Sequence, residues 1–193
     1  MTDINVSTPL FTSHKSTSVP VTAINYETLM DMVLPIRIGS DFISRKAPAT
    51  YDFSMHAAHE PIILSNKLVL DVYEGGHFGL AAPQVGIDYR VIAVAGFDSA
   101  LFNPTIVDVG GLPTALEEIS PSFPTTKVKI TRAPHVEIRY LDAHGKFNKK
   151  IFTGMTARIL QQLIEILEGK SILDHTSDFK KSKILAKTDK LLK

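Results

Sequence analysis

The stretch Gly76-His77-Phe78-Gly79-Leu80-Ala81-Ala82-Pro83-Gln84 is the most informative part of this 193-residue chain. Two glycines and two alanines within nine residues are typical of a loop that a helix, another backbone or a ligand approaches closely. Upstream, the apolar residues between Pro61 and Tyr73 fall mostly on one helical face, and Gly75 predicts the end of that helix. We therefore expect a helix that leads into a close-packed, glycine-rich loop.

Composition excludes several classes of protein. The net charge is +1, from 21 basic and 20 acidic side chains, so no strong field marks the whole chain as a nucleic-acid or membrane binder. The chain contains no cysteine, which excludes disulfides, thiolate metal ligands and a cysteine nucleophile. No run reaches the roughly 18 apolar residues that a membrane span needs, and no classical signal peptide begins the chain. We expect a soluble protein that is cytoplasmic during its synthesis and has no membrane partner.

The chain divides into an arm, a domain and a tail. Residues 1–25 are rich in serine and threonine and predict an extended arm, and residues 26–178 have the patterning of one domain. Residues 179–193 predict a basic, weakly amphipathic tail. Within the domain, the apolar run Val33–Ile38 contains Pro35, which favours an edge strand or the segment that leads into one.

Apolar patterning predicts the remaining elements. Residues 89–95 and 101–107 are compact and β-branched, and they predict buried strands. Residues 127–130 and 135–141 alternate polar and apolar side chains, as half-exposed antiparallel strands do. Residues 154–168 predict a helix that is apolar almost all round and should therefore be central.

With these motifs, residues 33–178 resemble the peptide deformylase family. The family's loop has the form GxGxAAxQ, which residues 76–86 match with one extra residue between the glycines. The family's Glu-Gly-Cys-Leu-Ser-x-Pro motif aligns with residues 118–124, and its Gln-His-Glu-x-x-His helix aligns with residues 161–166. The resemblance implies an α+β fold in which antiparallel or mixed sheets pack around a central C-terminal helix.

The same resemblance implies that the metal chemistry of the family is absent. Deformylases hold Fe²⁺ or a substitute metal with one cysteine and two histidines, and Ser120, Gln162 and Ile166 stand at those positions. A hydroxyl and an amide are poor ligands for a divalent ion, and isoleucine is none. Leu163 replaces the glutamate that moves the proton, and Pro121 has no N–H to offer an oxyanion. We expect no metal, no other cofactor and no catalysis.

The retained residues allow two interpretations. Gly79, Leu80, Gln84 and Pro121 could line a cleft that still binds a peptide, or the small residues could persist because backbone and helix pack closely there. Gln84 is the retained oxyanion donor of the family, but a buried hydrogen bond within its own fold fits equally well. Glu118 and Arg158 could form an ion pair across the core.

Other polar residues are interpreted as structural. For His56 and His59, two solvated or capping side chains are favoured over a metal site, because no third ligand is near in sequence. Asp174 and His175 follow the central helix and predict a surface turn.

These expectations favour a non-catalytic deformylase-like protein that serves as a structural or assembly subunit. Because deformylase-like proteins occur in tailed phages, a virion component of the tail or baseplate is the concrete version, with other protein subunits as partners. One alternative is a pseudoenzyme whose cleft captures a peptide strand. Another is a ribosome-binding pseudoenzyme, in which the tail from Lys180 to Lys193 contacts RNA phosphates. An active deformylase is the remaining alternative.

Overall fold

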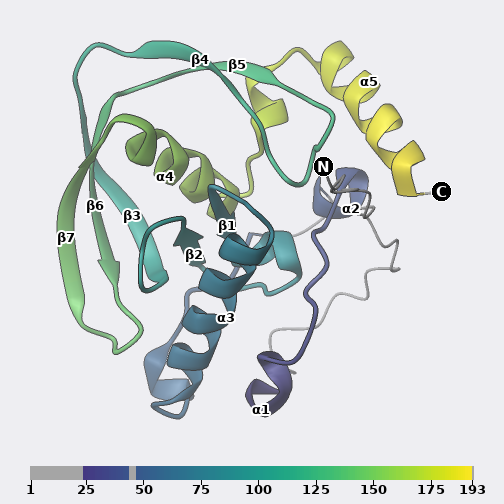
Figure 1. Ribbon diagram of the computed structural model, residues 1–193. Coiled ribbons are helices and arrows are strands. Elements are labelled where there is room, and N and C mark those ends of the chain that lie inside the picture. The colour runs from purple at the N-terminus through teal and green to yellow at the C-terminus, as the bar shows by residue number, and fades with distance from the viewer. Residues whose placement is uncertain (1–23, 44–46, 193) are drawn as a thin grey trace, which may run out of the picture.

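The structure is a computed structural model that describes residues 24–43 and 47–192, so the predicted arm lies almost wholly outside the described residues. Its architecture is α+β, as predicted (Figure 1). The α-helices are α1 (Tyr26–Leu29), α2 (Gly39–Ile43), α3 (Glu60–Glu74), α4 (Gly154–Leu167) and α5 (Asp178–Asp189). The strands are β1 (Gly79–Ala81), β2 (Val91–Val94), β3 (Leu101–Gly110), β4 (Thr114–Glu118), β5 (Val128–Arg132), β6 (His135–Leu141) and β7 (Phe147–Thr153). Short 3₁₀ helices occupy Phe53–Met55, Ala82–Val85, Ile172–His175 and Lys190–Leu192.

Two antiparallel sheets form the body of the protein. The larger has the order β1-β2-β3-β6-β7, and β4 pairs with β5 in a separate two-stranded ribbon. Helix α4 lies between the ribbon and the larger sheet, with β1 and α3 in front of it in this view (Figure 1). The prediction of sheets packed around a C-terminal helix is therefore confirmed.

Strand β2 shows why the larger sheet has a core on each face. Successive side chains of a strand point to opposite faces. Ile92 and Val94 pack into the cluster that surrounds α4, whereas Val91 and Ala93 pack into the cluster that includes α3. Because both faces are covered, the strand is a continuous apolar run rather than an alternating one.

Most predicted elements match the structure, with one clear error. Both long helices are confirmed: α3 ends at its C-cap Gly75, and α4 is followed by Gly169 at a φ of +83°. The strand expected within Val33–Ile38 is wrong, because residues 33–37 are irregular and α2 begins at Gly39. Pro35 cannot donate a ladder hydrogen bond, and Arg37 donates its N–H to the Gln84 carbonyl at 2.6 Å instead.

The C-terminal residues are ordered against the body. Helix α5 is capped by the Ser177 side chain and lies beside α2 (Figure 1). Ser40 donates hydrogen bonds from its backbone N–H and its hydroxyl to the carboxylate of Asp189, at 2.9 and 2.6 Å. The residues predicted as a basic tail therefore include a docked helix. Among the described residues, no helix has the length and apolar character to cross a membrane.

Candidate functional site

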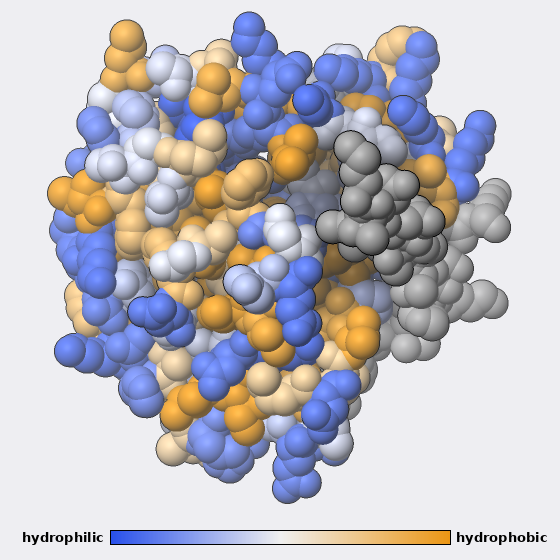
Figure 2. Space-filling view, in the orientation of Figure 1, coloured by the Kyte–Doolittle hydropathy of each residue, from blue (hydrophilic) through white to orange (hydrophobic). Residues whose placement is uncertain are grey.

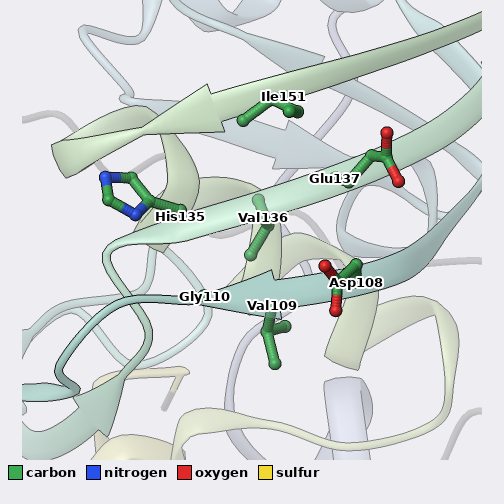
Figure 3. Close-up of a pocket in the computed structure, with 7 residues that line it drawn as sticks. All are labelled: Asp108, Val109, Gly110, His135, Val136, Glu137 and Ile151. Atoms are coloured by element: carbon green, nitrogen blue, oxygen red, sulfur yellow. The ribbon is translucent and has the colours of Figure 1, made fainter.

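The described surface has two hollows that could serve as a site. The smaller, of about 200 Å³, lies on β3 and β6 beside Val109, Val136 and Ile151 (Figure 3). The larger, of about 500 Å³, lies between the glycine-rich loop and a wall formed by residues 116–121, which are the end of β4 and the residues after it. This side is called the β4 wall, and α4 forms the floor. Hydrophobic residues gather across the middle of the face shown in Figure 2, and many of the residues along its outline are hydrophilic. The larger hollow, hereafter the cleft, is the candidate site because the loop and both aligned motifs line it.

Gly79 is required by the close approach of α4 to β1. A β-carbon at this position would lie 2.8 Å from Cδ1 of Leu163, 2.9 Å from the Ala93 carbonyl oxygen and 3.1 Å from Cγ2 of Ile159. Real β-carbons do not come this near to backbone atoms, so any larger residue would displace the strand or the helix. This contact supports the structural interpretation of the small residues. Leu80, by contrast, points into the core that includes α3 and does not line the cleft.

Gln84 is held by its own fold. Its side chain is 1 % exposed, and its Oε1 accepts the backbone N–H of Ala81 at 3.0 Å. Its Nε2 donates to Oγ of Ser122 at 3.2 Å and to Oγ of Ser120 at 3.5 Å. The amide therefore ties the glycine-rich loop to the loop that follows β4, and it is committed before any ligand arrives.

The three positions that correspond to the family's metal ligands are only partly brought together. Ser120 and Gln162 both line the cleft, and Gln162 donates from Nε2 to the Ile119 carbonyl at 2.9 Å. Ile166 is 2 % exposed and packs in the core around α4. One hydroxyl, one amide and one alkyl side chain do not fit a divalent metal ion. Across residues 24–43 and 47–192, no group of three His, Cys, Asp or Glu side chains could hold one either.

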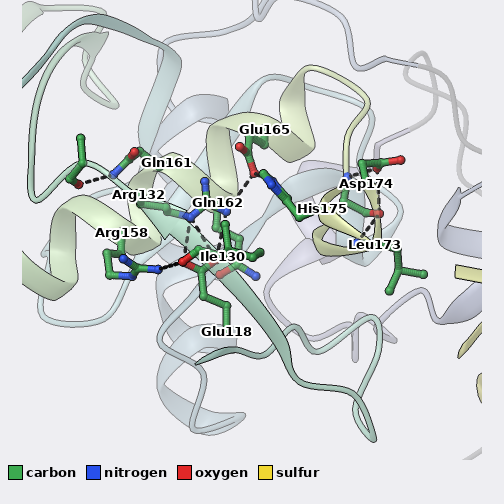
Figure 4. Close-up of polar contacts among 12 residues, drawn as sticks. Glu118, Ile130, Arg132, Arg158, Gln161, Gln162, Glu165, Leu173, Asp174 and His175 are labelled. Carbon is green, nitrogen blue, oxygen red and sulfur yellow. Dashed lines mark hydrogen bonds and ion pairs between the residues drawn. The ribbon is translucent and has the colours of Figure 1, made fainter. Parts of the chain in front are cut away.

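A buried ion network holds the β4 wall to α4. Glu118 accepts from Arg132 through Nε and Nη2, at 2.8 to 3.0 Å, and from Nη2 of Arg158 at 2.8 Å (Figure 4). Arg158 also donates to the carbonyls of Thr114 and Ile130. The predicted pair of Glu118 and Arg158 is therefore confirmed as one part of a larger cluster.

Arg132 is the residue that the sequence analysis missed. It shares the inward face of β5 with Val128 and Ile130, four and two residues earlier, and it is 4 % exposed. Period-two alternation could have shown that an arginine points inward there and needs buried partners. Its second partner is Glu165, at 2.9 Å from Nη2, which also contacts Nε2 of His175 at 3.1 Å.

The network keeps Glu165 ionised. Burial alone would raise the pKa of this carboxyl, but the hydrogen bond and charge of Arg132, with a further contribution from His175, outweigh burial and lower the pKa. Burial likewise opposes the charge of Arg132, and the two carboxylates reverse that effect and raise its pKa. Both partners therefore remain charged at neutral pH, as a buried pair needs.

The remaining histidines take other roles. His56 is neither solvated nor a cap: its ring stacks on Tyr51 with centroids 4.4 Å apart, and its Nδ1 lies 2.9 Å from Glu60. His59 occupies the N-cap position of α3 without a side-chain capping bond. His77 lines the cleft, and burial lowers its pKa, so the imidazole is neutral at pH 7. Asp174 and His175 form the surface turn that was predicted, as part of the 3₁₀ helix after α4.

Comparisons with known proteins identify the family. The polypeptide deformylase family model matches residues 36–182, and the chain belongs to this family. It is 31% identical over 151 residues to a peptide deformylase of Thermotoga petrophila. This alignment covers 76% of this chain and 88% of the relative. The class I type b peptide deformylase of Acinetobacter baumannii superposes with a TM-score of 0.70 at 26% identity, covering 75% of this chain and 99% of that one. A probable peptide deformylase of Synechococcus phage S-SSM7 has a TM-score of 0.67 at 26% identity, covering 75% and 100%.

This family membership corrects two expectations. The prediction that the chain is not an enzyme is contradicted, because the family and the matching relatives are peptide deformylases, which are metal-dependent enzymes. The prediction of a structural or assembly subunit of a virion is contradicted for the same reason. The alternative predictions of a peptide-binding or ribosome-binding pseudoenzyme are contradicted as well. The error lay in extending side-chain differences at a few motif positions to the class of the whole protein.

Proposed function

We propose that this protein functions on peptides, by binding the amino-terminal segment of a peptide in the cleft. Its relatives are named for acting on peptides, and family membership brings the same class of molecule to this chain. The observation that carries the proposal is that the cleft lies between two strand edges above an apolar floor formed by Ile159 and Leu163. Such a cleft accepts an extended chain through main-chain hydrogen bonds and takes alternate side chains into its pocket.

The first edge is that of β1. Ala95 donates its backbone N–H to the Phe78 carbonyl, so the polar groups of Phe78 face β2. In an antiparallel pair the next residue directs its N–H and C=O to the opposite side, which places those of Gly79 toward the cleft. The following outward N–H, that of Ala81, is already bonded to Gln84. Gly79 is therefore the β1 residue available to pair with a peptide.

The second edge is that of β4, and the mouth of the cleft adds exposed apolar surface. Within the described residues, strand β4 pairs only with β5, and Leu116, Glu117 and Glu118 of β4 line the cleft. Large apolar side chains stay exposed around the mouth, including Phe78 at 64% and Met155 at 62%. Exposed apolar surface beside two strand edges favours a peptide whose leading side chains are apolar.

Binding of short peptides to the purified full-length chain tests this proposal. We expect a fluorescent peptide that begins with formyl-methionine to bind with a dissociation constant below about 1 mM. Phe78→Ala should weaken binding about fivefold, through the loss of buried apolar area. Phe147→Ala is the matched control, because Phe147 is equally exposed, at 61%, but lies on β7. Absence of binding, or equal weakening by both changes, would contradict the proposal.

The same samples also measure turnover. Release of formate from the formylated peptide, with and without added divalent metal, reports whether the family's reaction follows binding. Phage origin stays a prediction, and the phage-encoded relative supports it. The other predicted partners, which are further protein subunits and nucleic acid at Lys180–Lys193, also stay predictions.

A further inference from the structure

The cleft holds a donor and an acceptor that the fold does not use, at two of the positions where the metal ligands would stand. Ser120 accepts hydrogen bonds from Nε2 of Gln84 at 3.5 Å and from the backbone N–H of Ser122 at 3.3 Å. A hydroxyl has two acceptor lone pairs and one proton. With both lone pairs engaged, the Ser120 hydroxyl proton is left to donate, and no described residue accepts it within hydrogen-bond distance.

Gln162 supplies the matching acceptor. One of its Nε2 protons is fixed on the Ile119 carbonyl at 2.9 Å, which sets the orientation of the amide. Its Oε1 has no hydrogen bond from the described part of the chain. Because Ile119 directly precedes Ser120, the same contact brings the two side chains to one end of the cleft.

The carboxylate that precedes Ser120 in the cleft lining is already balanced by buried cations. Glu118 also lines the cleft, but two guanidinium groups surround its carboxylate. A cationic ammonium placed beside Ser120 and Gln162 would lose part of its hydration without gaining Glu118 as a free counter-charge. The remaining charged residues of the lining, Glu117 and Lys127, have opposite signs. A neutral amide loses much less, because its C=O can accept from Ser120 and its N–H can donate to Gln162.

We propose that Ser120 and Gln162 form a metal-independent binding site for one neutral amide group of the peptide. The inference rests on the proposed peptide-binding function and adds to it the chemistry of the group that is bound. Such an amide is either the acyl cap of a blocked N-terminus or an internal peptide bond, and both present one carbonyl and one N–H.

Four peptides with the same core distinguish these sources when titrated into the full-length protein in the presence of EDTA. They are formyl-Met-Ala-Ser, acetyl-Met-Ala-Ser, free-amine Met-Ala-Ser and free-amine Ala-Ala-Met-Ala-Ser. We expect both capped peptides to bind about tenfold more tightly than free-amine Met-Ala-Ser. If the longer free-amine peptide binds as tightly as the capped ones, the amide is an internal peptide bond; if it binds weakly, the amide is the cap.

Variants test the two residues. Gln162→Met preserves the length of the side chain and should reduce the preference for a capped peptide about fivefold. Gln161→Met is the matched control: Gln161 is the neighbour on α4, bonded to the Ala133 and Ala157 carbonyls and absent from the cleft. Ser120→Ala should act like Gln162→Met. Because it also removes a partner of Gln84, its folding is checked by thermal unfolding, and Gln162→Met decides if it does not fold.

The outcomes separate the two proposals. If no peptide binds, the peptide-binding function fails and this inference fails with it. If all four peptides bind equally, or if Gln162→Met leaves the preference unchanged, the Ser120 and Gln162 site is overturned while peptide binding stands. If EDTA abolishes binding, the site depends on metal and the inference is overturned.

Discussion

The two walls of the cleft are held by different physical means. The glycine-rich wall depends on close contact, since α4 lies against the bare backbone of Gly79. The β4 wall depends on charge, since Arg132 and Arg158 of β5 and α4 converge on Glu118. Packing tolerates no added atom, whereas the charge network tolerates no lost partner. The comparison shows that a chain can keep the shape of a cleft through contact and charge while the side chains at its centre differ from those of its family.

The largest expected effect comes from rebuilding the family's ligand trio at residue 120, after β4, and at residues 162 and 166 of α4. Ser120→Cys, Gln162→His and Ile166→His together should give a chain that binds one Zn²⁺ with a dissociation constant below about 1 µM, or about 8 kcal/mol. The unmodified chain should bind none stoichiometrically. Metal content after dialysis and titration with a chromogenic zinc indicator measure both.

The control for this variant moves one histidine off the shared helix face. Residues 162 and 166 are one turn apart on α4, whereas 161 and 166 do not share a face. Ser120→Cys with Gln161→His and Ile166→His should therefore bind zinc far more weakly. Equal affinity of the two triple variants would show that α4 does not direct positions 162 and 166 toward residue 120.

Removal of one network partner should be the next largest effect. Arg132→Met leaves Glu118 with a single guanidinium and deprives Glu165 of its main partner, and both carboxylates are largely buried. We expect the free energy of unfolding to fall by about 4 kcal/mol in urea titrations. Arg139→Met, at an exposed position on β6, should cost less than about 0.5 kcal/mol. Similar losses for both would mean that the network does not hold the wall.

A larger side chain in the glycine-rich wall should lower the free energy of unfolding by somewhat less than the loss of Arg132. Gly79→Val forces a side chain against Leu163 and the Ala93 carbonyl, and we expect a loss of about 3 kcal/mol in the same urea titrations. The control Gly110→Val has its nearest neighbour 4.0 Å from the added β-carbon and should change stability by less than about 1 kcal/mol. If Gly79→Val were as stable as the unmodified chain, the close contact between β1 and α4 would be disproved.

The smallest expected effect is a dependence on acid pH. Glu165 has a pKa below its ordinary value of 4.5 in the folded chain, so folding favours its ionised form. This contribution is complete above that ordinary value and is lost as the pH falls through the lower folded pKa. Urea titrations from pH 7 to pH 3 should therefore show a smaller loss of stability in Glu165→Gln than in the unmodified chain. Glu168→Gln, at an exposed position, should follow the unmodified chain, and an identical loss in all three would contradict the role of Glu165.

The sequence predicted those parts of the fold in which periodicity reports burial. Helix α4 has a long apolar face that packs in the core, and strand β2 is apolar on both faces because it lies between two core clusters, so both patterns can be recognised. Strands β4 and β7 were not predicted, because they are mostly exposed and carry charged residues such as Glu117 and Lys149. The apolar run at 33–38 was mistaken for a strand because apolar pattern alone does not show whether backbone groups find a partner strand.

The candidate site was predictable in its membership but not in its bonding. The motifs indicated that residues 79–84, 118–124 and 161–166 meet, and the structure places them around one cleft. What each side chain does there depends on partners far away in the sequence, such as the contact of Arg132 with Glu165, 33 residues later. Such pairings depend on how β5 and α4 are oriented in space, which local patterns do not contain.

The contact between Ser40 and Asp189 also constrains the order in which the protein can be completed. Helix α2 is five residues long, too short to persist by itself, and its contacts with α5 come from near the other end of the chain. While the protein is being synthesised, the contact of Ser40 with Asp189 must wait for a residue that lies 149 positions later in the sequence. The segments that form the cleft and its walls lie between these two helices in the sequence, so they can assemble before α5 joins α2.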